Sequence, residues 1–354
     1  MTKRQIALLA CTATLAATGV GAAVPASASS SVHRVKPGES IQKAVDAARP
    51  GDTIVLSPGT YRESVRITTS HLTLRGSTVF PTVIVPAVSP GDDPCAEAGN
   101  GICVTGSEER PVEGVRVRSL TLRGFAKNGL WARWTDRLEV QRVTAESNGT
   151  WGIAQERSVR SVLRHNTARN NGDAGLFVAN TVSEEAGATD TGGTVISHNR
   201  VSGNRIGITV RRVRNLTVDR NEATGNCAAV FVVGDESAPR AGAMRLRWNH
   251  VHDNNKLCPK TPRLPFLQGS GIVLTGAEET LVAHNRVVDN VGASPLSGGI
   301  VLFKSFVGVH NERNEIRDNT VLRNGGADLA NRDTGTGNTF RGNTCGVSEP
   351  AGLC

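Results

Sequence analysis

Short runs of alternating apolar and polar residues, each followed by an asparagine, recur along most of the chain. In six segments a second asparagine follows five residues later, and then usually glycine and an aliphatic residue. These pairs are Asn166 and Asn171, Asn199 and Asn204, Asn221 and Asn226, Asn249 and Asn254, Asn285 and Asn290, and Asn319 and Asn324. Asn128 and Asn148 extend the second series backwards, and its shortest steps are 20 to 23 residues. Six recurrences of one offset indicate an internal repeat.

The period and the alternation of this repeat predict its structure. Alternation with period two is typical of strands, and such a period is too short for two helices with their turns. Each repeat is therefore predicted to be a coil of short strands. A leucine-rich repeat has a similar length, but its regular leucine framework is absent. We expect the asparagines to stack at one turn of successive coils, where each amide can donate to and accept from its neighbours.

The start of the chain predicts a cap for this stack. Ile41, Ala44, Val45 and Ala48 fall on one face of a short helix that begins behind Ser40 as N-cap, as a terminal plug requires. We expect a cap and first coil over residues 29–70. Residues 71–354 are then the solenoid, with loop insertions and a C-terminal tail closed by a disulfide.

Three early segments carry a family resemblance. Residues 40–48 read SIQKAVDAA, residues 50–67 read PGDTIVLSPGTYRESVRI, and residues 72–76 read LTLRG. Together with the asparagine repeat, they resemble right-handed parallel β-helix proteins of the pectate-lyase-like superfamily. The resemblance implies an all-β, right-handed parallel β-helix, a solenoid of three sheets with a short N-terminal capping helix. It also implies an asparagine ladder between the second and third sheets and carbohydrate binding on the first.

Applied to this chain, the resemblance places the first asparagine of each pair in the ladder and the glycine–aliphatic segments in the first sheet. The predicted first-sheet strands are residues 130–133, 153–156, 176–179, 208–211, 230–233, 272–275 and 300–303.

Alternation along these strands predicts which side chains face outward on the first sheet. Aromatic rings beside charged groups are typical of sites that hold sugar rings and uronates, although an ordinary polar sheet face is the alternative. The candidate substrate-binding residues are Trp131, Arg133, Phe177, Asn180 and Phe231. Insertions at residues 181–191, 234–242 and 305–313 directly follow first-sheet strands, and we expect them to flank the groove.

A lyase-type site is the catalytic hypothesis for this face. Arg211 or Lys304 would remove the proton α to a uronate carboxylate, and Glu156 or Asp235 would help to hold Ca²⁺, the candidate cofactor. Segments typical of pectin methylesterases, polygalacturonase-type hydrolases and alginate epimerases are absent. We therefore predict a lyase or hydrolase acting on acidic polysaccharide, with a non-catalytic polysaccharide-binding or surface-structural protein as the alternative.

A metal site is a further alternative. His250 and His252 can place two imidazoles on one strand face, but no third ligand is evident nearby. His165, His198 and His284 each precede a ladder asparagine, and we expect them on the outside of the second sheet. Copper-maturation proteins of this fold keep the metal alternative open.

Charge favours an anionic partner. The chain has 40 Lys and Arg against 32 Asp and Glu, and 33 of the basic residues are Arg, whose planar fork matches carboxylate oxygens. A merely soluble surface is the competing interpretation. No lysine-rich run or RNA-type aromatic motif occurs, so we expect no nucleic acid. The predicted partner is an acidic polysaccharide, and the predicted protein is a monomer.

Residues 1–28 have the pattern of a signal peptide. Lys3 and Arg4 precede an apolar run, and Ala26-Ser27-Ala28 fits a cleavage site. A lipoprotein acylated at Cys11 would leave too short an apolar region. No later stretch has the ~18 apolar residues of a membrane helix, so we predict no membrane insertion and secretion to the extracellular space.

Six cysteines remain after this cleavage, an even number that favours disulfides in an exported chain. Proximity in the sequence predicts the pairs Cys95–Cys103, Cys227–Cys258 and Cys345–Cys354. A cysteine metal site is disfavoured because no paired CxxC occurs.

Overall fold

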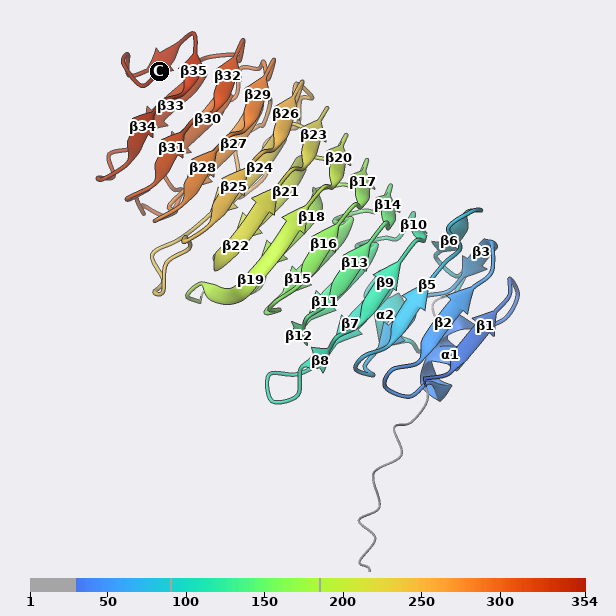
Figure 1. Ribbon diagram of the computed structural model, residues 1–354. Coiled ribbons are helices and arrows are strands. Elements are labelled where there is room, and N and C mark those ends of the chain that lie inside the picture. Colours follow the sequence, from blue (N-terminus) through green and yellow to red (C-terminus); the bar gives the residue numbers. More distant parts are fainter. Residues whose placement is uncertain (1–29, 90, 185) are drawn as a thin grey trace, which may run out of the picture.

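A computed structural model describes residues 30–89, 91–184 and 186–354, and the predicted signal peptide lies outside these residues. The described chain winds into a rod of three long parallel sheets (Figure 1). Strands of successive coils pair along the rod, whose length at ~4.8 Å per strand is about 50 Å. The predicted right-handed parallel β-helix with a short capping helix is therefore confirmed.

The strands fall into the three predicted sheets and one small extra pair. The first sheet contains β4 (Val65–Ile67), β7 (Ile102–Thr105), β11 (Leu130–Arg133), β15 (Ile153–Glu156), β18 (Ala174–Ala179), β21 (Ile206–Arg211), β24 (Ala228–Val233), β27 (Ser270–Thr275), β30 (Gly298–Phe303), β33 (Leu329–Arg332) and β36 (Ser348–Glu349). The second contains β1 (Val32–Val35), β2 (Thr53–Leu56), β5 (Thr73–Arg75), β9 (Arg116–Arg118), β13 (Glu139–Gln141), β16 (Val162–Arg164), β19 (Thr189–Ser197), β22 (Val213–Asp219), β25 (Arg245–Arg247), β28 (Leu281–Ala283), β31 (Glu315–Arg317) and β34 (Thr339–Arg341). The third contains β3 (Gly59–Arg62), β6 (Thr82–Val85), β10 (Thr121–Arg123), β14 (Thr144–Glu146), β17 (Thr167–Arg169), β20 (Arg200–Ser202), β23 (Glu222–Thr224), β26 (His250–His252), β29 (Arg286–Val288), β32 (Thr320–Leu322) and β35 (Thr344–Cys345). The extra pair is β8 (Val112–Glu113) and β12 (Thr135–Asp136).

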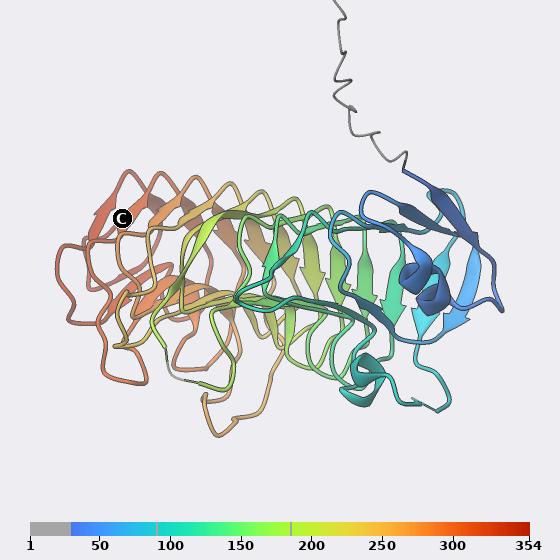
Figure 2. The same cartoon turned by 90° about the horizontal axis from the view of Figure 1, so that it is seen from below.

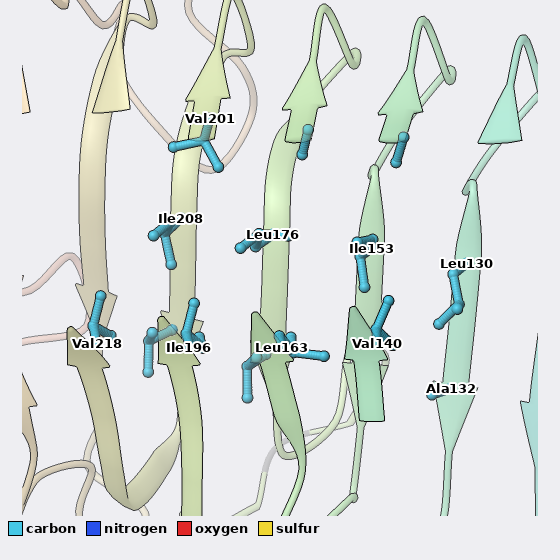
Figure 3. Packing of buried hydrophobic residues seen from close by; sticks show 14 of the residues in the cluster. Leu130, Ala132, Val140, Ile153, Leu163, Leu176, Ile196, Val201, Ile208 and Val218 are labelled. Atoms are coloured by element: carbon cyan, nitrogen blue, oxygen red, sulfur yellow. The ribbon is translucent and has the colours of Figure 1, made fainter. Parts of the chain in front are cut away.

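Stacking in register builds the core. Leu130, Ile153, Leu176 and Ile208 occupy one register position of the first sheet, and all four are fully buried (Figure 3). Aliphatic rows of this kind, one inward position per coil, fill the narrow interior of the rod. Each predicted first-sheet strand ends at its predicted residue, and from β18 to β30 each begins two residues earlier than predicted.

The predicted asparagine ladder lies at the turn between the second and third sheets. Asn199 Nδ2 donates to Asn221 Oδ1 at 2.9 Å, and Asn221 Nδ2 donates to Asn249 Oδ1 at 3.0 Å. The second asparagines form a parallel ladder at the turn from the third sheet back to the first, as between Asn204 and Asn226 at 3.1 Å. Two continuous amide stacks therefore satisfy the buried turn groups of the described repeats.

The histidines that precede ladder asparagines lie in this turn rather than on the second sheet. His165, His198 and His284 have φ of 55°, in the left-handed region, after the second-sheet strand has ended. The rings of His165 and His198 lie 4.9 Å apart, and His284 stacks on Trp248 at 4.5 Å. The expected position on the outer face of the second sheet is therefore wrong, because the left-handed residue turns the chain before each asparagine.

A helix covers the N-terminal end of the stack. Helix α1 (Ile41–Ala47) begins after Ser40, whose hydroxyl accepts from Lys43 N–H, and it buries Ile41 and Val45 against the first coils. A second, one-turn helix, α2 (Pro94–Glu97), carries Cys95.

None of the helices in the described ranges is long and apolar enough to cross a membrane.

All three predicted cysteine pairs are bonded, as Cys95–Cys103, Cys227–Cys258 and Cys345–Cys354. The first two tie loops beside the first sheet, and the third closes the C-terminal tail. Long connections in the green-to-orange part of the chain project from one side of the rod (Figure 2). One insertion is shorter than predicted: β19 begins at Thr189, which pairs with Val213, so residues 189–191 belong to the second sheet.

Candidate functional site

A groove of about 490 Å³ lies on the outer face of the first sheet. Its floor is formed by outward positions of β18, β21, β24 and β27. Walls come from the predicted insertions after β18, β24 and β30, which supply residues 182–184, 234–235 and 305–307. The predicted location of a groove along this sheet therefore coincides with a hollow in the structure.

A fourth wall, which the sequence analysis missed, comes from the insertion before β27. Residues 262–264 of this insertion line the groove, and the Cys227–Cys258 disulfide ties its base to β24. Arg205, which is buried, holds it through Nη1 at 2.6 Å from the Pro259 carbonyl and Nη2 at 3.4 Å from the Pro265 carbonyl. The signal available in the sequence was the long spacing between Asn254 and the next glycine–aliphatic strand.

Aromatic residues line up on the outer face toward one end of the groove. Trp131 stacks on Trp151 at 5.8 Å between centroids, and Trp151 stacks on Phe177 at 4.1 Å with ring planes 7° apart. The indole N–H of Trp151 donates to Asp173 Oδ2 at 3.0 Å, which fixes the ring at the groove wall. Trp151 was missed because it stands two residues before Ile153, an inward position, so alternation does not place it on the outer face.

The two phenylalanines predicted to bind substrate lie in the floor of the groove and are buried. Phe177 is 4% exposed and Phe231 is 2% exposed, the latter beneath Leu264 and Leu267 of the covering insertion. Outward direction on a strand does not produce exposure where a loop folds back over it. The exposed ring at the other end of the groove is Phe306, which is 49% exposed.

Charged groups of the groove are mostly engaged with one another. Asp235 forms a buried ion pair with Arg212, and Glu184 is 2.6 Å from Arg157. Arg211 is half-buried on the floor, with Nη1 3.5 Å from the Val182 carbonyl. The guanidinium of Arg211 therefore lies on the floor of the groove, and two carboxylates of the groove are paired with arginines.

Three other predicted residues lie outside this groove or are used within the fold. Asn180 is buried, and its Nδ2 donates to the carbonyls of Ala186 and Gly187 at 2.9 and 2.8 Å, so it holds the insertion after β18. Arg133 and Glu156 lie beside each other on β11 and β15, 4.0 Å apart.

The structure separates the predicted catalytic residues. Arg211 ends β21 and Lys304 follows β30, three strand spacings or about 14 Å along the rod, and the two residues line different cavities. Glu156 on β15 and Asp235 after β24 are also three spacings apart, whereas Ca²⁺ needs oxygens at about 2.3–2.6 Å. The Ca²⁺ hypothesis is therefore not supported, because each carboxylate pairs with an arginine instead.

These features define a class: the chain is a right-handed parallel β-helix with a loop-walled groove on its first sheet. The family model described as "Right handed beta helix region" matches residues 184–349. The model described as "Periplasmic copper-binding protein (NosD)" matches residues 47–255, more than half of the chain, so the chain belongs to that family. No curated protein matches the sequence.

Solved structures have the same fold. The A-module of the mannuronan C-5 epimerase AlgE4 from Azotobacter vinelandii is 19% identical, with a TM-score of 0.59, over 87% of this chain and 91% of that one. DFA-IIIase from Arthrobacter chlorophenolicus A6, in complex with GF2, is 15% identical, with a TM-score of 0.57, over 87% and 80% of the two chains. At these identities the likeness establishes the fold alone.

The described residues do not fit a copper site. None of their His, Cys, Asp and Glu side chains gather in a group of three or more that could hold a metal ion. The six described cysteines are bonded in pairs, and Met244 is buried in the core. His250 and His252 do stack at 4.4 Å, but Nδ1 of His252 is engaged by Asp253 at 2.9 Å. The described part of the chain therefore lacks the donor set that copper prefers.

Proposed function

We propose that this chain is an exported β-helix protein that binds an acidic polysaccharide in the groove of its first sheet. The observation that carries the proposal is the pairing of Trp151 and Phe306 at the two ends of a groove whose floor holds Arg211. Along the rod these ends are five strand spacings apart, about 24 Å, which accommodates several sugar rings of an extended chain. Aromatic edges and faces contact sugar rings, and arginine holds their carboxylates.

Charge supports the preference for an acidic chain. Asp235 and Glu184 are each paired with an arginine, and Asp173 accepts from Trp151. Arg211 and Arg263 bring two further guanidinium groups to the lining. The guanidinium is suited to bidentate contact with a uronate carboxylate. Because the groove is open, we expect the affinity to fall as salt concentration rises. The disulfides are typical of an exported chain, and secretion to the extracellular space remains part of the proposal.

The same chemistry favours binding over turnover in this groove. Arginine stays protonated in proteins, so Arg211 is suited to hold a carboxylate and not to remove a proton. Lys304, the other candidate base, lies in a different cavity. Asp173, Asp235 and Glu184 are engaged by Trp151, Arg212 and Arg157. The non-catalytic alternative is therefore the better supported of the two functions.

Calorimetric titration with oligomers of mannuronate, guluronate and galacturonate, and with neutral glucan oligomers, tests the proposal. We expect uronate binding that Arg211→Gln weakens about tenfold, the effect of one charge-assisted contact. Arg245→Gln, an exposed arginine on the second sheet, is the matched control and should leave the affinity unchanged. Equal binding of neutral oligomers, or wild-type affinity in Arg211→Gln, would reject the proposal.

Turnover is measured in the same samples. β-Elimination produces a conjugated double bond that absorbs in the ultraviolet, whereas hydrolysis produces new reducing ends without that absorbance. We expect neither signal above the protein-free control. A signal that Arg211→Gln removes would restore the lyase or hydrolase hypothesis for this groove.

A further inference from the structure

A second cavity, of about 540 Å³, lies beyond the groove toward the C-terminal end of the first sheet. It is lined by the last two residues of β33, by the two residues that follow β33, and by residues of the insertion after β30. The insertion after β30 separates the two hollows, because Phe306 lines the groove while His310 lines the second cavity. The second cavity contains Lys304, which the sequence analysis assigned to the groove.

A buried carboxylate anchors this cavity. The side chain of Asp333 is completely buried, and both of its oxygens are engaged. Oδ2 accepts from the backbone N–H and the side-chain amide of Asn311 at 2.6 and 2.8 Å, and Oδ1 accepts from Thr334 N–H at 2.7 Å. Burial alone would raise the pKa of Asp333, but the hydrogen bonds from Asn311, His310 and Thr334 outweigh it and hold this pKa below its usual value.

The carboxylate orients the ring of His310 and selects the tautomer of its neutral form. Nδ1 of His310 lies 2.7 Å from Asp333 Oδ1, and an ionised carboxylate can only accept, so the proton of a neutral ring is on Nδ1. In this tautomer Nε2 carries the lone pair and can accept a hydrogen bond from a ligand. The side chain is 46% exposed and lines the cavity.

Lys304, Arg332 and Arg240 are the cationic side chains around His310, and the two arginines are paired with carboxylates. Lys304 is exposed at the cavity wall, and no carboxylate in the described ranges lies within ion-pair distance of it. Arg332 lines the wall from β33, with Nε 2.9 Å from Glu349 and Nη1 2.8 Å from the Ser297 carbonyl. From the other side, Arg240 donates to the His310 carbonyl. In the neutral ring, the Nε2 acceptor of His310 beside the Lys304 ammonium matches a ligand that carries a hydroxyl and a carboxylate on one small frame.

We propose that this cavity is a separate binding site for a single uronic acid unit, whose carboxylate is held by Lys304 and whose hydroxyl donates to His310 Nε2. Asp333 is a positioning residue that keeps the imidazole acceptor turned toward the ligand. The choice of a sugar acid rests on the proposed function, whereas the acceptor–cation pair rests on the cavity alone.

Carbethoxylation of His310 by diethylpyrocarbonate, followed by peptide mass spectrometry, tests this site in the full-length exported chain. Glucuronate should slow modification of His310 about tenfold at saturation, because it covers Nε2, whereas glucose at the same concentration should not. Lys304→Ala should abolish this protection. Lys127→Ala, an exposed lysine far along the rod, should retain it. Nitrogen chemical shifts should show the Nδ1–H tautomer in the wild type and a loss of that preference in Asp333→Asn.

Each result has one meaning for the site. Protection by glucose as well as glucuronate, protection by neither, or full protection in Lys304→Ala would overturn the proposal. An unchanged tautomer in Asp333→Asn would reject the positioning role of that residue. Oligouronate binding that depends on Arg211, without protection of His310, would leave the groove function standing and remove the second site. Protection of His310 without oligouronate binding would leave the second site standing and remove the groove function.

Discussion

Replacement of one ladder asparagine by leucine measures how much the amide stack contributes to stability. Asn221 is 2% exposed and lies in the middle of the first ladder. Its Oδ1 accepts from the backbone N–H and the amide of Asn199 at 3.0 and 2.9 Å, and its Nδ2 donates to Ile196 O at 2.9 Å and to Asn249 Oδ1 at 3.0 Å. Leucine has similar volume but none of these groups.

The cost of Asn221→Leu follows from the groups that lose a partner. Two donors of Asn199 and the carbonyl of Ile196 lose their bonds to position 221 in a buried turn that water does not reach. Asn249 Oδ1 loses one of two donors but keeps the backbone N–H of position 221. At about 1–2 kcal/mol for each of three unpaired groups, the free energy of unfolding should fall by about 3–6 kcal/mol.

Urea unfolding followed by far-ultraviolet circular dichroism gives this difference. Thr217→Leu is the control, because Thr217 faces outward on β22 in the same coil and takes no part in the ladder. We expect the control to remain within about 0.5 kcal/mol of the wild type. If Asn221→Leu unfolds at the same urea concentration as Thr217→Leu, the stacked amides do not stabilise the turn and the reasoning fails.

Three further outcomes can be checked. Hydrogen bonds from Arg49 N–H, His33 and Ser31 N–H lower the pKa of Asp52 to about 2, so its charge stabilises the fold above about pH 4 and this contribution is lost as the pH falls toward 2. Asp52→Asn should flatten that part of the stability–pH curve, and an unchanged curve would contradict it. Arg205→Ala should increase proteolysis within residues 255–267, whose carbonyls Arg205 binds, and unaltered cleavage would show that the disulfide alone holds the insertion. Peptide mapping without reduction should recover the three cysteine pairs, and free thiols at two or more positions would disprove them.

The repeat was sufficient to predict the coils and the stacked asparagines, and the family resemblance then assigned the ladder turn and the first-sheet strands. In a stacked solenoid each residue meets its equivalent one coil away, so a local pattern also specifies the long-range pairing. For this reason Leu176 could be placed opposite Ile208 without coordinates, and Asn199 beside Asn221. The disulfide pairs were predicted from the short distances between their cysteines along the sequence.

The groove and the second cavity depended on how the insertions fold, which no repeat specifies. Phe231 points outward by alternation, yet residues 255–267 cover it, because the tie from Arg205 and the Cys227–Cys258 bond draw that insertion over the sheet. His310 sits in an insertion with no counterpart in neighbouring coils, and only the folded chain brings its Nδ1 to the buried Asp333. The sequence thus determined the scaffold through repeated local contacts. The tertiary structure decided the sites, because single contacts between non-repeating loops set which side chains are covered and which are left to meet a ligand.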